Sequence, residues 1–266
     1  MGNFTLGRYL PLDSPIHKLD PRAKIMAMLL LLITIFFPAG WIGYGVIFVS
    51  VSVVIILSKL SVSFIWKAMK PMLFMLFFLL VINALVLKTG TVLFTIGSWS
   101  LYSDAVFQTL YIAVRLLLMI MITTCLTATT KPLEMTLGIE DLLSPFQKIG
   151  LPSHEIAMLI SIALRFIPDL IDETARIIKA LESRGVDMKE GKLMERVMAI
   201  LSLIVPLFVS AFQRAEDLAN AMEARGYAPG LPRTRYKQLE MKKQDWFLLA
   251  CCAVLMGVII WIAWFR

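Results

Sequence analysis

The chain has 266 residues, of which 59% are hydrophobic, and its mean hydropathy is +0.79. Soluble domains are usually about 45–50% apolar, so the excess predicts a chain that is largely surrounded by lipid. The formal net charge is +7, but the surplus lies mainly beside apolar runs, where membrane proteins carry Lys and Arg, and no basic domain is left to bind nucleic acid.

Long apolar runs predict about five membrane spans. They lie at 25–38, 41–57, 71–87, 105–128 and 246–265. The first two are predicted to form a short helical hairpin, because Pro38 and Gly40 interrupt one apolar run that is too long for a single span. A long tilted helix with a re-entrant piece is the alternative. Residues 88–104 are predicted to form a loop.

The distribution of basic residues predicts the orientation in the membrane. The segments 1–24 and 58–70 are both expected on the cytoplasmic side, which places the N-terminus inside. We therefore predict an N-terminal membrane domain over 1–130, a cytoplasmic coupling-helix domain over 131–245 and a C-terminal transmembrane helix over 246–266. The expected location is a bacterial or archaeal cytoplasmic membrane, crossed several times.

Two apolar runs in the middle section, 156–171 and 197–212, are shorter than a spanning helix needs and continue into charged helical sequence. They predict long helices that begin against the membrane and extend into or along its cytoplasmic surface, and whether either run enters the bilayer stays open. The predicted fold class is an all-α integral membrane protein with about five transmembrane helices and long cytoplasmic or interfacial coupling helices.

One hexapeptide occurs twice in this section. Ala180-Leu181-Glu182-Ser183-Arg184-Gly185 recurs as Ala221-Met222-Glu223-Ala224-Arg225-Gly226. Gly185 and Gly226 are of the type that stops a helix in a left-handed turn. Arg184 and Arg225 would then lie in the last turn, at the negative end of the helix dipole. A single copy is typical of an ordinary helix end.

The duplication favours a function beyond helix termination. Glu182 and Glu223 are not needed to stop a helix, and a Glu two residues before an Arg does not face it on the same helix. We predict that Arg184 and Arg225 meet another surface, since a guanidinium is always charged and makes paired hydrogen bonds. Two equivalent ends indicate two equivalent sockets, as on a dimeric partner such as a pair of ATPases.

These features resemble the transmembrane T component of energy-coupling factor transporters, an ABC-type family. The resemblance covers most of the chain, and the paired triplets are its most specific part. Its motifs are SPIHKLDPR at 14–22, TTKP at 129–132, GLP at 150–152, RFIP at 165–168 followed by Asp172-Glu173, and the triplets Ser183-Arg184-Gly185 and Ala224-Arg225-Gly226. Ser183 departs mildly from the Ala that usually opens the family's first triplet.

The resemblance implies a non-catalytic subunit that passes ATP-driven motion from two ATPase subunits to one membrane-embedded S component, for uptake of vitamins or similar micronutrients. The ATPase-coupling residues that it implies are Glu182, Ser183, Arg184, Gly185, Glu223, Ala224, Arg225 and Gly226. Arg165, Pro168 and Pro206 are expected at helix hinges. No GxxxxGK[ST] phosphate loop occurs, so ATP and Mg²⁺ are expected on the partners and no cofactor on this chain.

Other functions stay open at this point. A T component dedicated to a cobalt or nickel importer is the nearest alternative. An integral membrane enzyme would need converging polar residues within the spans, where the sequence offers Asn83 and Arg115 without a catalytic motif. A secondary carrier would be expected to carry its repeat within the membrane.

Charged residues within and just after the apolar run 156–171 allow two interpretations. Asp169, Asp172 and Glu173 could serve acid–base chemistry, but a solvated or ion-paired helix face is favoured. Arg165 is expected either to pair with Asp169, four residues later, or to anchor the helix at the lipid headgroups. The two histidines and the three cysteines, which lie far apart or within apolar runs, predict neither a metal site nor a disulfide.

Overall fold

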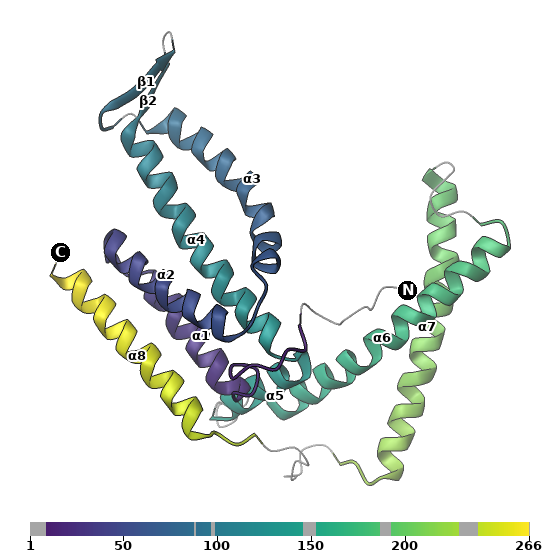
Figure 1. Cartoon of the computed structure of the whole chain (residues 1–266). Coiled ribbons are helices and arrows are strands. Elements are labelled where there is room, and N and C mark those ends of the chain that lie inside the picture. Colours follow the sequence, from purple (N-terminus) through teal and green to yellow (C-terminus); the bar gives the residue numbers. More distant parts are fainter. Residues whose placement is uncertain are drawn as a thin grey trace. The chain divides into compact units, whose positions relative to one another are not determined.

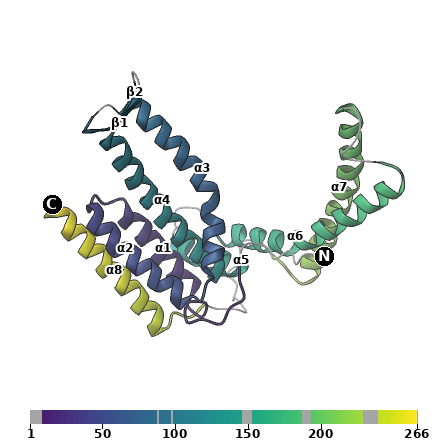
Figure 2. The ribbon, with the colours of Figure 1, turned by 45° about the horizontal axis from the view of Figure 1, so that its top comes forward.

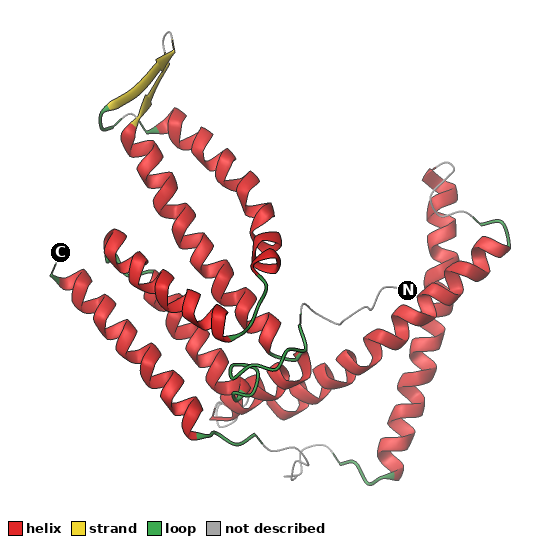
Figure 3. Cartoon of the chain, in the orientation of Figure 1, coloured by secondary structure: helices red, strands yellow, loops and turns green. Residues whose placement is uncertain are grey.

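The structure is a computed structural model and describes residues 9–87, 89–96, 99–145, 153–186, 193–228 and 239–265. These residues are mostly helical, with one pair of short strands (Figure 3), which confirms an all-α membrane protein apart from that pair. The elements are α1 (Pro21–Ile35), α2 (Gly40–Leu57), α3 (Val62–Val86), β1 (Val92–Ile96), β2 (Trp99–Tyr102), α4 (Ser103–Thr129), α5 (Pro132–Leu143), α6 (Ser153–Ser183), α7 (Leu193–Ala224) and α8 (Lys243–Trp264).

The chain forms two compact units. Among the described residues, one unit takes in 155–186 and 193–228, and so contains nearly all of α6 and the whole of α7. The other takes in the described residues of 9–154 and 239–265 and contains the remaining helices. Helix α5, which lies within the predicted section 131–245, packs on α1 and so belongs with the N-terminal helices.

Five helices in the described part of the chain are long and apolar enough to cross a membrane, namely α2, α3, α4, α7 and α8. The number agrees with the prediction, but the members differ. Helix α1 has only 15 residues, or about 22 Å of rise, against a hydrocarbon core of about 30 Å. Helix α7 qualifies because the apolar run 197–212 is continuous with helix on both sides.

The third predicted span begins earlier than expected. Helix α3 begins at Val62 and continues through Pro71, so Lys67 and Lys70 lie inside it and not in a flanking segment. Proline removes one backbone donor, but neighbouring helices, Ser and Thr side chains or a local adjustment of the helix can satisfy the freed carbonyl, and Pro is more frequent in membrane helices than in soluble ones.

The predicted loop 88–104 contains a β-hairpin. Strands β1 and β2 pair antiparallel, with Val92 opposite Tyr102 and Ile96 opposite Trp99, and the hairpin caps the ends of α3 and α4 (Figure 1). The prediction was wrong because Gly and Ser were weighed above the β-branched and aromatic residues around them. Two such runs separated by two residues, one of them Gly97, are a hairpin signal.

The core of the larger unit lies where α1, α2, α4 and α8 meet, side by side in Figures 1 and 2. Ile35, Leu118 and Ile259 are fully buried there. The outer faces are the opposite: Phe74 on α3 is 79% exposed. Large exposed apolar side chains are a liability in water, and their frequency here fits helices that face lipid.

Polar side chains within these helices are satisfied locally. Thr34, Ser50 and Ser58 each donate their hydroxyl to the carbonyl four residues earlier, at 2.7–2.9 Å. Such bonds let a hydroxyl remain in an apolar environment without a partner on another helix. Asn83 instead donates to the hydroxyl of Thr109, at 3.0 Å, and so joins α3 to α4.

Candidate functional site

The end of α6 closes in a complete Schellman motif. Gly185 has φ +79°, its amide donates to the carbonyl of Glu182 at 3.0 Å, and the amide of Val186 reaches back to the carbonyl of Leu181 at 3.0 Å. These are the two bonds that satisfy the last carbonyls of a helix. The left-handed backbone is the reason that Gly occupies this position.

The end of α7 repeats the motif bond for bond. Gly226 has φ +73°, its amide donates to the carbonyl of Glu223 at 2.8 Å, and the amide of Tyr227 donates to the carbonyl of Met222 at 2.9 Å. The two ends therefore share a backbone conformation as well as a sequence. Glu182 and Glu223 occupy equivalent positions, at which their carbonyls take part in the helix stop.

Neither arginine is buried against the rest of the described chain. Arg184 and Arg225 are exposed, as are the neighbouring Glu182 and Glu223. Within the described residues no ion pair or side-chain hydrogen bond engages either guanidinium. Each helix end thus presents five unused donors on a fixed backbone, which suits recognition of carboxylates or backbone carbonyls on another protein.

Helices α6 and α7 cross at an ion-pair cluster, and the crossing is visible in Figures 1 and 2. Arg214 on α7 donates to a carboxylate oxygen of Glu173 on α6 at 3.3 Å, and its other terminal nitrogen lies 3.9 Å from Asp169. Arg176 lies 3.7 Å from the same oxygen of Glu173. Asp169 and Glu173 are therefore ion-paired and Asp172 is exposed to solvent, in keeping with the solvated or ion-paired face favoured from the sequence, and Arg214 is the partner that the sequence did not identify.

The crossing lies at equivalent positions of the repeat. Glu173 and Arg214 are 41 residues apart, which is also the offset from Arg184 to Arg225. From the crossing to the arginine each arm therefore has the same length, about 16 Å at the rise of an α-helix. Two equal arms that meet at one point present Arg184 and Arg225 as a matched pair. The shared offset is a signal that could have limited the crossing to pairs of residues 41 apart in the sequence.

The predicted hinge residues lie within continuous helices. Helix α6 runs through Pro168 and α7 through Pro206 without a break. Arg165 is exposed and does not pair with Asp169, because Asp169 turns to Arg214 on the other helix. That alternative for Arg165 is thereby removed. A hinge function at Pro168 or Pro206 stays a prediction.

The polar residues within the membrane spans do not converge. Asn83 is bonded to Thr109, whereas Arg115 donates to the hydroxyl of Tyr44 at 2.9 Å and lies over the rings of Phe36 and Tyr111, 5.6 and 5.5 Å from their centres. Each polar group thus has its own structural partner. Within the described ranges no three His, Cys, Asp or Glu side chains lie close enough together to hold a metal ion, and the side chain of His154 lies outside the described residues.

Comparison with known proteins places these features in a family. A profile of the CbiQ family, described as cobalt transport protein, matches residues 13–236. The energy-coupling factor transporter transmembrane protein EcfT of Macrococcus caseolyticus is 45% identical over 240 residues, covering 90% of this chain and 91% of that protein. The proteins of the same name from Listeria innocua and Bacillus subtilis are 42% and 40% identical, each over 98% of this chain and 99% of their own length.

Proposed function

We propose a function for this chain from one premise: it belongs to the EcfT family of energy-coupling factor transporter transmembrane proteins. In this proposal it is the transmembrane coupling subunit of an importer and catalyses nothing itself. Helices α6 and α7 receive motion from two ATPase subunits and pass it to one membrane-embedded S component. The transported substrates are vitamins or similar micronutrients.

The observation that carries the proposal is the matched pair of helix ends. Arg184 and Arg225 are exposed, rest on identical Schellman turns and stand at equal distances from the Glu173–Arg214 crossing. A single partner site would need only one such end. Two equal ends fit a partner that offers the same groove twice, which is the form of a pair of like ATPase subunits.

The orientation follows from charge. The segment 1–24 and the region 58–70, which extends into the first turns of α3, are basic, and the positive-inside rule favours the cytoplasmic surface for both in this proposal, on the side of the ATPases. The membrane in this proposal is the bacterial cytoplasmic membrane, and ATP and Mg²⁺ are bound by the partner chains. The absence of converging polar groups among Asn83, Arg115 and their partners favours this subunit role over a membrane enzyme.

The test is the double variant Arg184→Ala and Arg225→Ala, compared with Arg196→Ala, which removes an exposed arginine from the other end of α7. We expect both variants to insert and purify normally in mild detergent. The double variant should lose co-purification of the ATPases and ATP-driven uptake, whereas Arg196→Ala should keep both. Wild-type ATPase binding and uptake in the double variant would refute the proposal.

A T component dedicated to cobalt is the second candidate, because the matching family profile carries that description. The two candidates differ in what accompanies the chain. Purification in mild detergent should recover ATPases with several different S components if the chain is shared among importers. Recovery with one S component that binds Co²⁺ would favour the dedicated importer.

A further inference from the structure

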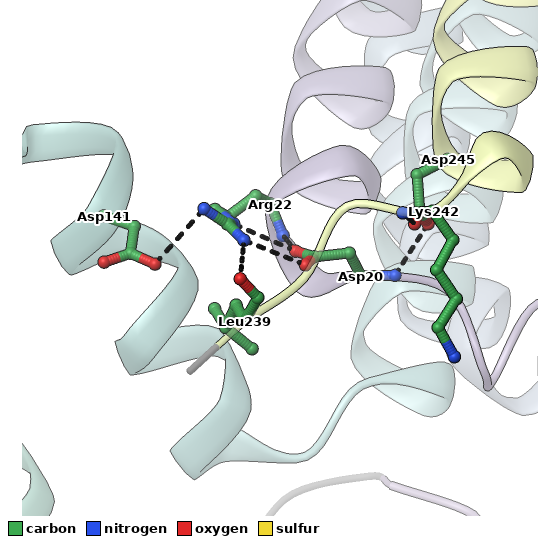
Figure 4. Close-up of polar contacts among 6 residues, drawn as sticks. All are labelled: Asp20, Arg22, Asp141, Leu239, Lys242 and Asp245. Atoms are coloured by element: carbon green, nitrogen blue, oxygen red, sulfur yellow. Dashed lines mark hydrogen bonds and ion pairs between the residues drawn. The ribbon is translucent and has the colours of Figure 1, made fainter. Parts of the chain in front are cut away.

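The larger unit holds a buried polar cluster at the base of its first and last helices, shown in Figure 4. Asp245, in the first turn of α8, is only 1% exposed and accepts the backbone amide of Asp20 at 2.8 Å and that of Lys242 at 2.7 Å. Asp20 in turn caps α1 by accepting the amide of Arg22 at 2.8 Å. One carboxylate thus joins the beginning of α1 to the beginning of α8.

Arg22 uses all three guanidinium nitrogens in this cluster. Its Nε and one Nη donate to the two oxygens of Asp20, both at 3.2 Å, and the same Nη donates to the carbonyl of Leu239. The other Nη lies 3.5 Å from the carboxylate of Asp141, in the last turn of α5. A guanidinium has five donors in a planar fork with fixed directions and can reach partners along different edges of its plane, whereas an ammonium is a compact point charge with all its donors on one atom.

Two of the charges in this cluster, Arg22 and Asp141, stand at helix ends that the dipole disfavours. Arg22 lies in the first turn of α1, where the helix dipole disfavours a cation, and Asp141 lies in the last turn of α5, where it disfavours an anion. Helix propensity therefore does not explain either residue, but their pairing does. The helices also approach closely here: a Cβ on Gly138 would lie 3.2 Å from that of Pro21 and 3.4 Å from the amide of Arg22.

Asp141 and Leu239 lie close to the two points at which the chain passes between its compact units. The chain passes from the larger unit into the α6–α7 unit between residues 154 and 155, soon after Asp141, and returns between 238 and 239. Leu239 is thus the first residue on the return. Arg22 contacts the last helix before the departure and the first residue after the return, and it holds both against the start of α1.

We propose that Arg22 is a positioning residue that fastens both connections of the α6–α7 unit to α1, so that motion of α6 and α7 enters the membrane helices and is not absorbed in the connections. The proposal rests on the coupling function proposed above. Asp20 and Asp245 complete the fastening, Asp20 by orienting the guanidinium and Asp245 by holding Lys242 beside α1. If Arg22 were bonded to only one connection, the other connection could move and absorb the motion.

The test compares Arg22→Gln, Arg22→Lys and Lys18→Gln in the full complex with two ATPases and an S component, in liposomes. Lys18→Gln removes an exposed cation four residues away and is the control. For Arg22→Gln we expect partner binding and ATP hydrolysis to stay near wild type. Uptake of the tritiated vitamin that the chosen S component binds, measured per ATP hydrolysed, should fall about tenfold. A change of this size lies within the range by which residues between two coupled sites modulate their coupling. Arg22→Lys should stay defective, because the fork is lost although the charge remains.

Full recovery in Arg22→Lys would show that only a basic charge at the membrane is required, and it would overturn the proposal. Wild-type uptake per ATP in Arg22→Gln would overturn it equally. Should Arg22→Gln fail to fold, Asp141→Asn decides the matter, because it loosens one connection and keeps the Asp20–Arg22 pair. We expect an intermediate loss of uptake per ATP in that variant, and wild-type coupling there would refute the fastening.

Failure of the proposed function would be distinguishable. If the Arg184 and Arg225 double variant keeps uptake, the coupling function fails whatever Arg22 does. Hydrogen exchange of the chain in nanodiscs then tests the fastening alone: Arg22→Gln should speed exchange of the amides in 239–242, and Lys18→Gln should not. Unchanged exchange at 239–242 would mean that Arg22 does not hold the return segment.

Discussion

Replacing the glycines at the two helix ends tests whether those ends must be held in their observed shape. Gly185 and Gly226 have φ of +79° and +73°, and no atom lies within 4 Å of a Cβ built on either. Alanine would therefore meet no steric clash, and its cost is that of the left-handed backbone alone, about 1–2 kcal/mol. Asparagine tolerates this conformation better and should cost less, whereas a β-branched Val should cost more.

The strain is relieved if the last turn unwinds, which moves the preceding arginine. The affinity for an ATPase then falls with the population of the native turn, by up to about tenfold for each 1.4 kcal/mol. We expect the order Gly, Asn, Ala, Val at position 226 when ATPase binding is measured with the chain in nanodiscs. Gly257→Ala is the matched control, because that glycine lies within α8, has equally open surroundings and lacks a positive φ.

Hydrogen exchange provides a second measurement on the chain alone. The amides of Val186 and Tyr227 donate the bonds that close the two turns, so Gly185→Ala should speed exchange at Val186 and Gly226→Ala at Tyr227. Affinity in the Ala variants equal to that of Gly257→Ala would refute the reasoning. So would a Gly226→Asn variant that is as defective as Gly226→Val.

Three further predictions concern stability, read from thermal unfolding in detergent. The side chains of Glu173 and Arg214 are about a quarter to a third exposed, so solvent weakens their attraction. A double-mutant cycle with Gln at both positions should therefore give a coupling free energy of only about 0.5–1 kcal/mol. A value near zero would mean that other contacts hold the crossing. Tyr44→Phe keeps the buried ring but leaves Nε of Arg115 without its acceptor, which should cost about 1–3 kcal/mol; an unchanged Tm would show that the bond is dispensable. Burial lowers the pKa of His17 below its usual value, so the unfolded chain binds more protons as the pH falls, and Tm should drop from about pH 7 to pH 5 by a margin that His17→Asn removes. Equal pH dependence in that variant would contradict the role of His17.

Local features of the sequence predicted the two helix ends well. The Arg-Gly pairs end α6 and α7 in the left-handed turns expected of them, because a helix stop is set by a few adjacent residues. The break at Pro38 and Gly40 likewise separates α1 from α2. Where two local signals compete, the sequence predicts a boundary less well. Pro71 predicts the beginning of a span, but α3 begins at Val62 and continues through Pro71, with apolar residues on both sides of it.

Partners far apart in the chain were not predictable in this way. Arg22 meets Asp141 and Leu239 across more than a hundred residues, and nothing in the local sequence of any of the three names the others. The signs that remained were indirect. A cation in the first turn of α1 and an anion in the last turn of α5 each oppose their helix dipole, and such residues persist when another part of the fold compensates them.

The Glu173–Arg214 pair shows how a sequence repeat helps to predict partners that lie far apart in the chain. Neither residue is unusual for its helix, and the two alternatives that the sequence left for Arg165, a pair with Asp169 or an anchor at the lipid headgroups, do not point to Arg214. The 41-residue offset narrows the choice, because two equivalent helices that cross at equivalent positions bring a residue i to residue i+41, as Glu173 is brought to Arg214. The contact itself selects which of these pairs forms. Any crossing of this kind gives arms of equal length to Arg184 and Arg225, so the repeat explains why both arginines lie at one common distance from the crossing, whereas the place of the crossing depends on the side chains that meet there.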